Sequence, residues 1–142
     1  MDTKRLIIGT IVGVVTLHVV GYLMFDLATV GFYAANDAAA ANFSRDVNLQ
    51  WSIGLGSLYL AALLTFVLVS RAGVLTIGTG AAIGAVVGFL VWAGVDFIRY
   101  GYEDRWNLTL TIIDSLLGAV QTGIGGAVIA AVLARVPKSA MA

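Results

Sequence analysis

The chain has 142 residues, of which 60% are hydrophobic and 11% are charged, and its mean hydropathy is +0.97. Because soluble domains carry charge on about a quarter of their residues, this composition excludes an ordinary soluble domain and predicts a membrane protein. Eight basic and eight acidic residues cancel, cysteine is absent and His18 is the single histidine, which argues against nucleic-acid binding and against a metal centre.

Four apolar stretches are long enough to span a bilayer, for which roughly 20 residues are needed. They cover about 6–30, 51–70, 74–99 and 108–134, and an outer loop at 36–50 separates the first two. The first stretch is too long for the apolar part of a secretory signal, so we expect it to stay as a helix. The sequence therefore predicts one domain over 1–142, an all-α integral membrane four-helix bundle with short connections.

Basic residues set the expected orientation, since they concentrate on the cytoplasmic side of membrane proteins. Five fall at the end that holds both termini and three at the other end. We therefore predict a bacterial inner-membrane location with both termini in the cytoplasm. Aromatic residues that favour the headgroup region gather at the predicted outer interface, and these are Trp51, Trp106, Tyr100 and Tyr102.

Glycines recur at helical spacing in three of the predicted helices. Small residues at this spacing let helix backbones approach closely in lipid, where packing rather than burial from water holds helices together. This pattern indicates packing within the bundle, with a dimer face as the alternative. The glycines concerned are Gly9, Gly13, Gly21, Gly80, Gly84, Gly88, Gly118 and Gly126.

Polar residues form a stripe along the first predicted helix. His18, Tyr22 and Asp26 follow one another at intervals of four, which places them on one helix face. A polar face in an apolar helix is expected to point into the bundle. An ionisable residue in a membrane segment is costly, so each one marks a candidate site.

The third and fourth predicted helices contribute further polar residues. Asp96 and Arg99 have the i,i+3 spacing of an ion pair, while Asp114 has no nearby cation along its helix and Gln121 lies two turns further on. A rise of 1.5 Å per residue puts Asp26, Asp96 and Asp114 at a similar depth. The sequence predicts that these carboxyl groups converge in the outer third of the membrane.

Three interpretations of this polar constellation stay open. It can be a buried network that fixes helix register, a site for a proton or a ligand, or a set of interfacial residues that face headgroups. Carboxylates held together without water either pair with cations or keep a proton, and Asp114 is the candidate for the latter. No enzyme motif such as GxSxG, HExxH or a P-loop occurs, so we predict neither catalysis nor a cofactor.

The second half carries Gly94-Val95-Asp96, then Trp106-Asn107-Leu108-Thr109-Leu110, then Asp114 and Gly118. This pattern resembles the C-terminal half of small bacterial four-helix membrane proteins that are grouped as domains of unknown function. The resemblance covers about 40 residues, and it implies an inner-membrane location with Asp96, Trp106 and Asp114 as the shared polar positions. It implies no activity.

The small size, the glycine faces and the short connections favour a non-catalytic protein that acts by helix packing, as an accessory or structural subunit or as a homo-oligomer. Its expected partners are the lipid bilayer and other membrane subunits or a second copy. The alternative is a small proton-linked transporter or binder of a cationic or amphipathic molecule, with Asp114 and Asp26 as contacts and Tyr22 and Trp92 as walls.

Overall fold

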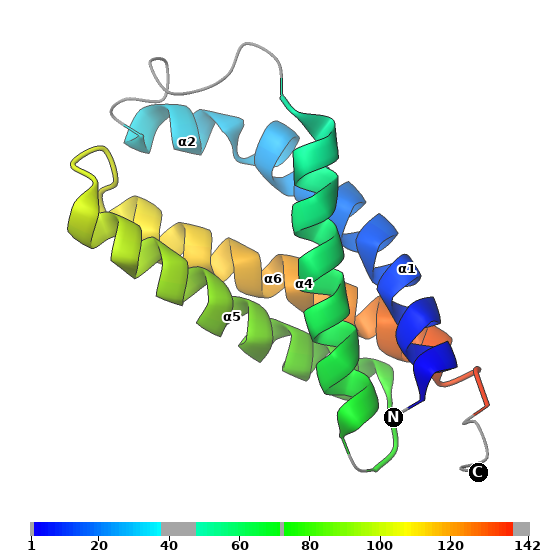
Figure 1. Cartoon of the computed structure of the whole chain (residues 1–142). Helices are drawn as coiled ribbons and strands as arrows, with labels where there is room; N and C mark the ends of the chain where they lie inside the picture. Colours follow the sequence, from blue (N-terminus) through cyan, green and yellow to red (C-terminus); the bar gives the residue numbers. More distant parts are fainter. Residues whose placement is uncertain (1, 38–47, 72, 138–142) are drawn as a thin grey trace.

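The computed structural model describes residues 2–37, 48–71 and 73–137. In chain order the elements are α1 (Thr3–Gly21), the π-helical segment η1 (Tyr22–Ala28), α2 (Val30–Asn36), α4 (Gln50–Ser70), α5 (Ile77–Tyr102) and α6 (Leu108–Leu133) (Figure 1). No strand forms within the described ranges. The predicted all-α class with four long apolar helices packed together is confirmed.

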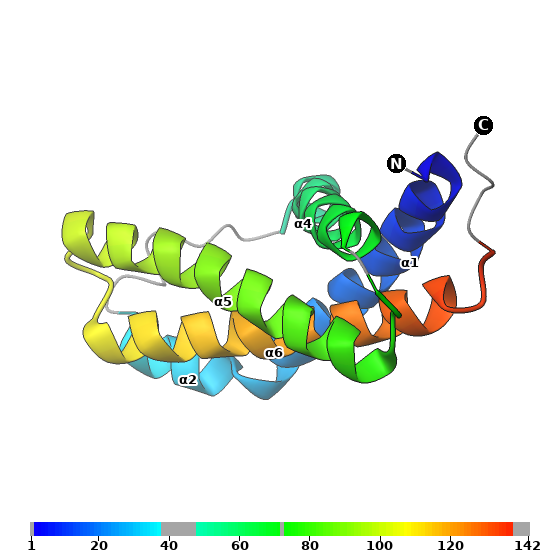
Figure 2. The same ribbon diagram turned by 90° about the horizontal axis from the view of Figure 1, so that it is seen from below.

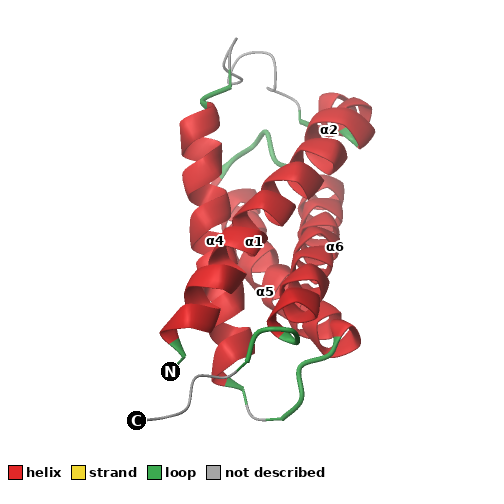
Figure 3. Cartoon of the chain, turned by 90° about the vertical axis from the view of Figure 1, so that its right-hand side faces the viewer, coloured by secondary structure: helices red, strands yellow, loops and turns green. Residues whose placement is uncertain are grey.

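The helices are arranged around α6. α5 and α6 run antiparallel and lie side by side, α1 packs against another side of α6, and α4 packs mainly against α1 (Figures 1 and 2). α4 and α5 touch at only a few positions. The beginning of α1 and the end of α6 lie at one end of the bundle, and α2 lies at the other (Figure 3).

A buried apolar cluster lies where α4 and α6 meet, near the end that holds both termini. Leu64, Leu68, Ile129 and Leu133 form this buried apolar cluster, and Ile8 and Val12 of α1 pack against it. α6 is the most enclosed helix, with half of its most apolar window buried against 17–22% for the other three spans. Side chains on α6 are therefore shielded from lipid on several sides.

The glycine stripe of α5 lies directly against α6. A Cβ atom at Gly80 would collide with the carbonyl oxygen of Gly126, and one at Gly84 with that of Thr122. At Gly88 the obstruction is the Thr122 hydroxyl. The two backbones are thus in direct contact, which only glycine permits.

The glycines of α1 also face inward. A Cβ at Gly9 would lie 2.5 Å from the Thr65 methyl group of α4, and one at Gly13 would lie 2.9 Å from the Ala61 Cβ. Gly21 stands against the Gln121 amide of α6. The predicted stripes therefore lie on surfaces that this chain already covers.

The first predicted helix, 6–30, is not continuous. α1 gives way at Tyr22 to a π-helical segment, and the α-helical path resumes only at Val30. At the break the Thr29 backbone N–H donates to the Met24 carbonyl at 2.9 Å, five residues back, and the Thr29 hydroxyl donates to the same oxygen at 2.7 Å. This wider turn changes which face of the chain points at which neighbour.

The third helix begins at Ile77 rather than at 74 and ends at Tyr102 rather than at 99. The start is fixed by a reciprocal cap, in which the Thr79 N–H donates to the Thr76 hydroxyl at 3.1 Å and the Thr76 N–H donates to the Thr79 hydroxyl at 2.9 Å. Gly73 has a φ of +94°, a conformation that favours glycine and turns the chain from α4 towards α5. Most of the predicted loop 36–50 lies outside the described residues.

Candidate functional site

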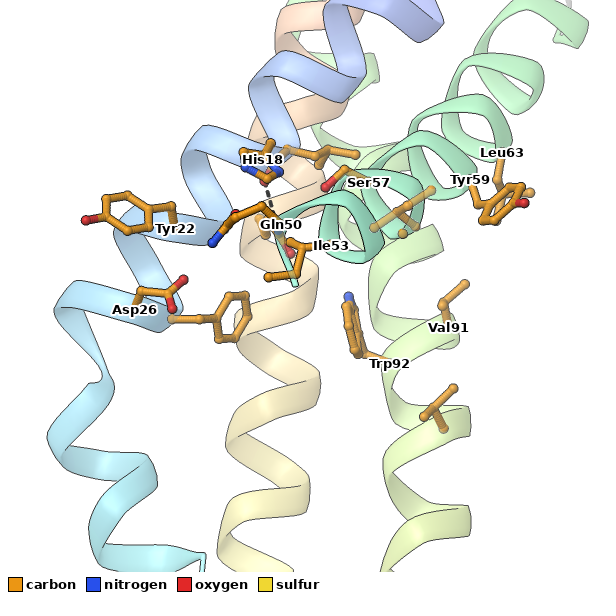
Figure 4. Close-up of a pocket in the computed structure, with 17 residues that line it drawn as sticks. His18, Tyr22, Asp26, Gln50, Ile53, Ser57, Tyr59, Leu63, Val91 and Trp92 are labelled. Carbon is orange, nitrogen blue, oxygen red and sulfur yellow. Dashed lines mark hydrogen bonds between the residues drawn. The ribbon is translucent and has the colours of Figure 1, made fainter. Parts of the chain in front are cut away.

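A cavity of about 590 Å³ opens beside α1 and η1, between α4 and α5 (Figure 4). It forms because α4 leans on α1 and makes few contacts with α5. A volume in the range of 300–1,000 Å³ is typical of sites for small organic ligands. The lining residues with polar side chains are His18, Tyr22, Asp26, Gln50, Ser57, Tyr59, Trp92 and Gln121.

The charged group at this cavity is the Asp26 carboxylate. Asp26 belongs to η1, its side chain points towards the cavity (Figure 4), and it accepts a long hydrogen bond of 3.5 Å from the Asn48 amide. Among the residues that line the cavity there is no lysine or arginine. The Asp26 carboxylate therefore gives the wall negative charge that suits a positively charged group.

Two of the residues that line the cavity each carry a buried polar atom that has no hydrogen-bond partner among the described residues. These atoms are Nε1 of Trp92, a donor, and Oε1 of Gln121, an acceptor. The other end of the Gln121 amide is fixed, because its Nε2 donates to the Leu17 carbonyl at 2.9 Å. Since a buried polar group without a partner is costly, these two atoms mark positions for polar atoms of a ligand or for water.

A second polar group lies between α5 and α6, where Asp96 is 0% and Asp114 is 7% exposed. The two carboxyl groups lie close enough together to interact. Asp96 Oδ2 also accepts from the Ser115 hydroxyl at 3.1 Å. The predicted convergence of these two carboxyl groups is seen in the structure.

Tyr33 of α2 closes this group from the side, and its hydroxyl donates to Asp114 Oδ1. Tyr33 lies beyond the first candidate span, Thr3–Ala28. Burial first, then the hydrogen bond to Asp114 and its charge, raise the pKa of the Tyr33 phenol above its ordinary value. The hydroxyl therefore keeps its proton and remains a donor to Asp114.

Asp26 does not join the other two carboxyl groups, which corrects the predicted convergence of all three. In a regular helix Asp26 and Tyr33, seven residues apart, would share a face. The π-helical turns and the break at Thr29 instead leave Asp26 at the cavity and turn Tyr33 towards α6. Two residues that a regular helix would carry on one face thus lie in two separate places.

The predicted ion pair between Asp96 and Arg99 is also wrong. The Arg99 Nε donates to Glu103 at 3.3 Å, and the guanidinium carbon lies 3.7 Å from the centre of the Trp106 ring. Stacking on an aromatic face and a carboxylate one turn further on hold the guanidinium near the surface. Asp96 has no salt bridge among the residues that the structure describes.

The predicted aromatic residues differ in exposure. Trp106 is only 6% exposed, because the guanidinium groups of Arg99 and Arg105 lie over its ring. Tyr22, expected to point inward, is exposed, and its hydroxyl points away from the cavity (Figure 4). Trp51, Tyr100 and Tyr102 are exposed, as residues of an interface would be.

Of the predicted polar residues, His18, Asp26 and Gln121 line the cavity, Tyr22 lies at its rim, and Asp96 and Asp114 form the separate pair. Sequence reasoning missed Ser115, which is buried between the two aspartates. Its position directly after Asp114, on a helix that packs against Asp96, was the available signal. Within the described residues no group of three or more His, Asp or Glu side chains could hold a metal ion.

Comparison of the chain with protein-family models, with curated proteins and with solved structures finds no match. The resemblance of the second half to small four-helix membrane proteins stays a prediction. Four helices are long and apolar enough to cross a membrane: Thr3–Ala28, Gln50–Ser70, Ile77–Tyr102 and Leu108–Leu133. The chain is that of an integral membrane protein.

Proposed function

We propose that this protein binds a small amphipathic organic cation in the cavity between α1, α4 and α5. The observation that carries the proposal is a pair of buried, unpartnered atoms on two residues that line the cavity, Trp92 Nε1 and Gln121 Oε1. One hydrogen-bond donor and one acceptor without partners favour a ligand that has polar atoms of its own. The proposal involves no covalent chemistry.

The ligand class follows from the rest of the lining. The Asp26 carboxylate supplies negative charge without a basic residue beside it in the lining, which favours a cationic group. Apolar side chains such as Leu60, Leu63 and Val91 form most of the surface, so the body of the ligand is apolar. We assign the cationic group to Asp26 and the apolar body to the space between α4 and α5.

The test uses decyltrimethylammonium as the probe and decyl sulfate, with the same chain and opposite charge, for comparison. Binding to the protein in lipid nanodiscs is measured by equilibrium dialysis, with empty nanodiscs subtracted. We expect saturable binding of the cation and not of the sulfate. Asp26→Asn should weaken cation binding about fivefold, because a partly solvated charge contact contributes little more than that.

Asp104→Asn is the matched control, since Asp104 is an exposed carboxylate in the turn after α5 and does not line the cavity. It should leave binding unchanged. Equal binding of cation and sulfate, or binding no greater than to empty nanodiscs, would contradict the proposed ligand class. An equal loss in both variants would remove Asp26 as the specific contact.

A second candidate function is that of a non-catalytic accessory subunit in a bacterial inner membrane, with both termini in the cytoplasm. It is favoured by the row of exposed apolar residues on the outer face of α1, namely Ile7, Ile11, Val15 and Val19. Such a face suits a partner helix as well as lipid. The inward-facing glycines do not add to this surface.

Native mass spectrometry of the protein extracted gently from its own membrane distinguishes the two candidates. Stoichiometric attachment of other subunits is the result expected for an accessory role. A monomer that carries a reproducible small cation would contradict that role and favour the cavity. Activity of a cytoplasmic reporter fused after Ala142 tests the orientation separately, and a reporter active only outside the cytoplasm would reverse it.

A further inference from the structure

The pair of carboxyl groups between α5 and α6 has properties that the proposed ligand site does not use. Asp96 and Asp114 are buried, and their carboxyl groups adjoin each other. Within the described part of the chain, every salt bridge involves Asp37 or Glu103 rather than this pair. With no salt bridge to either group, two adjoining ionised carboxylates would repel each other.

The number of protons available near Asp96 and Asp114 shows whether their two carboxyl groups can lie together without a proton of their own. Two hydroxyl protons are at hand, those of Tyr33 and Ser115. The Tyr33 proton is donated to Asp114, and the single Ser115 proton serves either the Thr111 carbonyl at 2.8 Å or Asp96 Oδ2 at 3.1 Å. Neither is available to the contact between the two carboxyl groups, which needs a proton of its own.

The position of that proton follows from the remaining partners. Asp114 Oδ1 already accepts a hydrogen bond from the Tyr33 hydroxyl, so this oxygen acts as an acceptor. Asp96 Oδ1 is buried and receives no hydrogen bond among the described residues. An oxygen without a donor, next to a carboxylate, is the one that can itself carry the proton.

We propose that Asp96 and Asp114 form a proton-binding site that holds one proton at neutral pH, with Asp96 as the protonated member. Three elements contribute the titratable or charged groups near it. These are Tyr33 from α2, Asp114 from α6, and Arg99 from α5, whose guanidinium is engaged with Glu103 and Trp106. This inference does not rest on a ligand in the cavity.

Infrared spectroscopy tests the proposal directly, because a protonated carboxyl group has a C=O stretching band distinct from that of a carboxylate. The protein is measured at neutral pH in an ester-free maltoside detergent, in H2O and in D2O. We expect one such band in the wild type, shifted by deuterium. Asp96→Asn should abolish it while preserving the fold, since the amide can donate to Asp114 in place of the carboxyl proton.

Asp104→Asn is the control for the loss of a carboxyl group at an exposed site, and it should leave the band intact. Ser115→Ala removes a hydrogen-bonding neighbour of Asp96 without removing either carboxyl group, so it should shift the band and not abolish it. If Asp96→Asn does not fold, Ser115→Ala still tests whether the band belongs to Asp96. Absence of the band in the wild type, its persistence in Asp96→Asn, or an unmoved band in Ser115→Ala would overturn the proposal.

Discussion

At the scale of single residues, the wall of the cavity is unusual because it leaves hydrogen-bonding capacity unused at fixed positions. The Trp92 ring rests against Gly118 of α6, where a Cβ would collide with it. Gln121 is held through its own Nε2. Neither side chain can turn away without loss of these contacts, so the donor and the acceptor without partners keep their positions.

Gly56 offers a residue-scale test of the cavity. It lines the cavity, and a Cβ added there would meet nothing within 4 Å, so Gly56→Phe should fill the space without disturbing the helices. We expect binding of decyltrimethylammonium to fall at least tenfold, roughly the effect of about 1.4 kcal/mol, when measured by dialysis in nanodiscs. The thermal midpoint should change little.

Gly54→Phe is the matched control, because Gly54 lies on the same helix, is equally open and does not line the cavity. It should bind the probe as the wild type does. If Gly56→Phe binds normally while folded, the ligand lies elsewhere, and the cavity is not the site.

The residue scale is also where sequence reasoning met its limit. The similar depth of Asp96 and Asp114 was foreseeable from helix rise alone, and they do meet. The i,i+3 spacing of Asp96 and Arg99 was compatible with an ion pair, but it could not reveal that the Trp106 ring and Glu103 compete for the same guanidinium. Competition of this kind depends on where the turn after α5 folds back.

At the scale of the elements, the contact between α5 and α6 differs from the other helix contacts. Their backbones touch at Gly80, Gly84 and Gly126, whereas α1 and α4 meet through side chains such as Thr65 and Ala61. We infer that the α5–α6 hairpin is the most tightly packed pair in the molecule. Its glycine spacing was visible in the sequence, while the identity of its partner helix was not.

Substitution of one glycine tests this order of packing. Gly84→Ala places a methyl group against the Thr122 carbonyl oxygen and Gly123. It should lower the free energy of unfolding by about 2 kcal/mol, a typical effect of overpacking, as measured by reversible unfolding in mixed detergent micelles. Gly94→Ala, on the same helix with open space around it, should be neutral or stabilise by up to about 1 kcal/mol.

A result in which both variants lose stability equally would show that the effect comes from α5 itself and not from its contact with α6.

The first helix shows what the sequence could not predict about the elements. Its apolar length was evident, but the π-helical segment Tyr22–Ala28 was not, because no proline or glycine pair marks a break there. That segment alone divides Asp26 from Tyr33 and creates two polar places instead of one.

At the scale of the whole molecule, the apolar runs of the sequence were sufficient to predict four long apolar helices, and these are confirmed. They could not predict that α4 would lean on α1 and part from α5. In a membrane an apolar helix face can contact lipid as favourably as another helix. The sequence therefore does not show which of the four helices pack against each other. The cavity forms because α4 packs against α1 and makes few contacts with α5.

The separation of α4 from α5 has a consequence for how a compound reaches the cavity. The gap lies between two helices that cross the membrane, so the last part of the route runs sideways through the acyl chains and not straight from water. The relevant concentration is then that of the compound dissolved in the bilayer. Its apparent dissociation constant, referred to water, should scale with its lipid–water partition coefficient, and longer alkyl chains should seem tighter binders even where the protein contacts are the same.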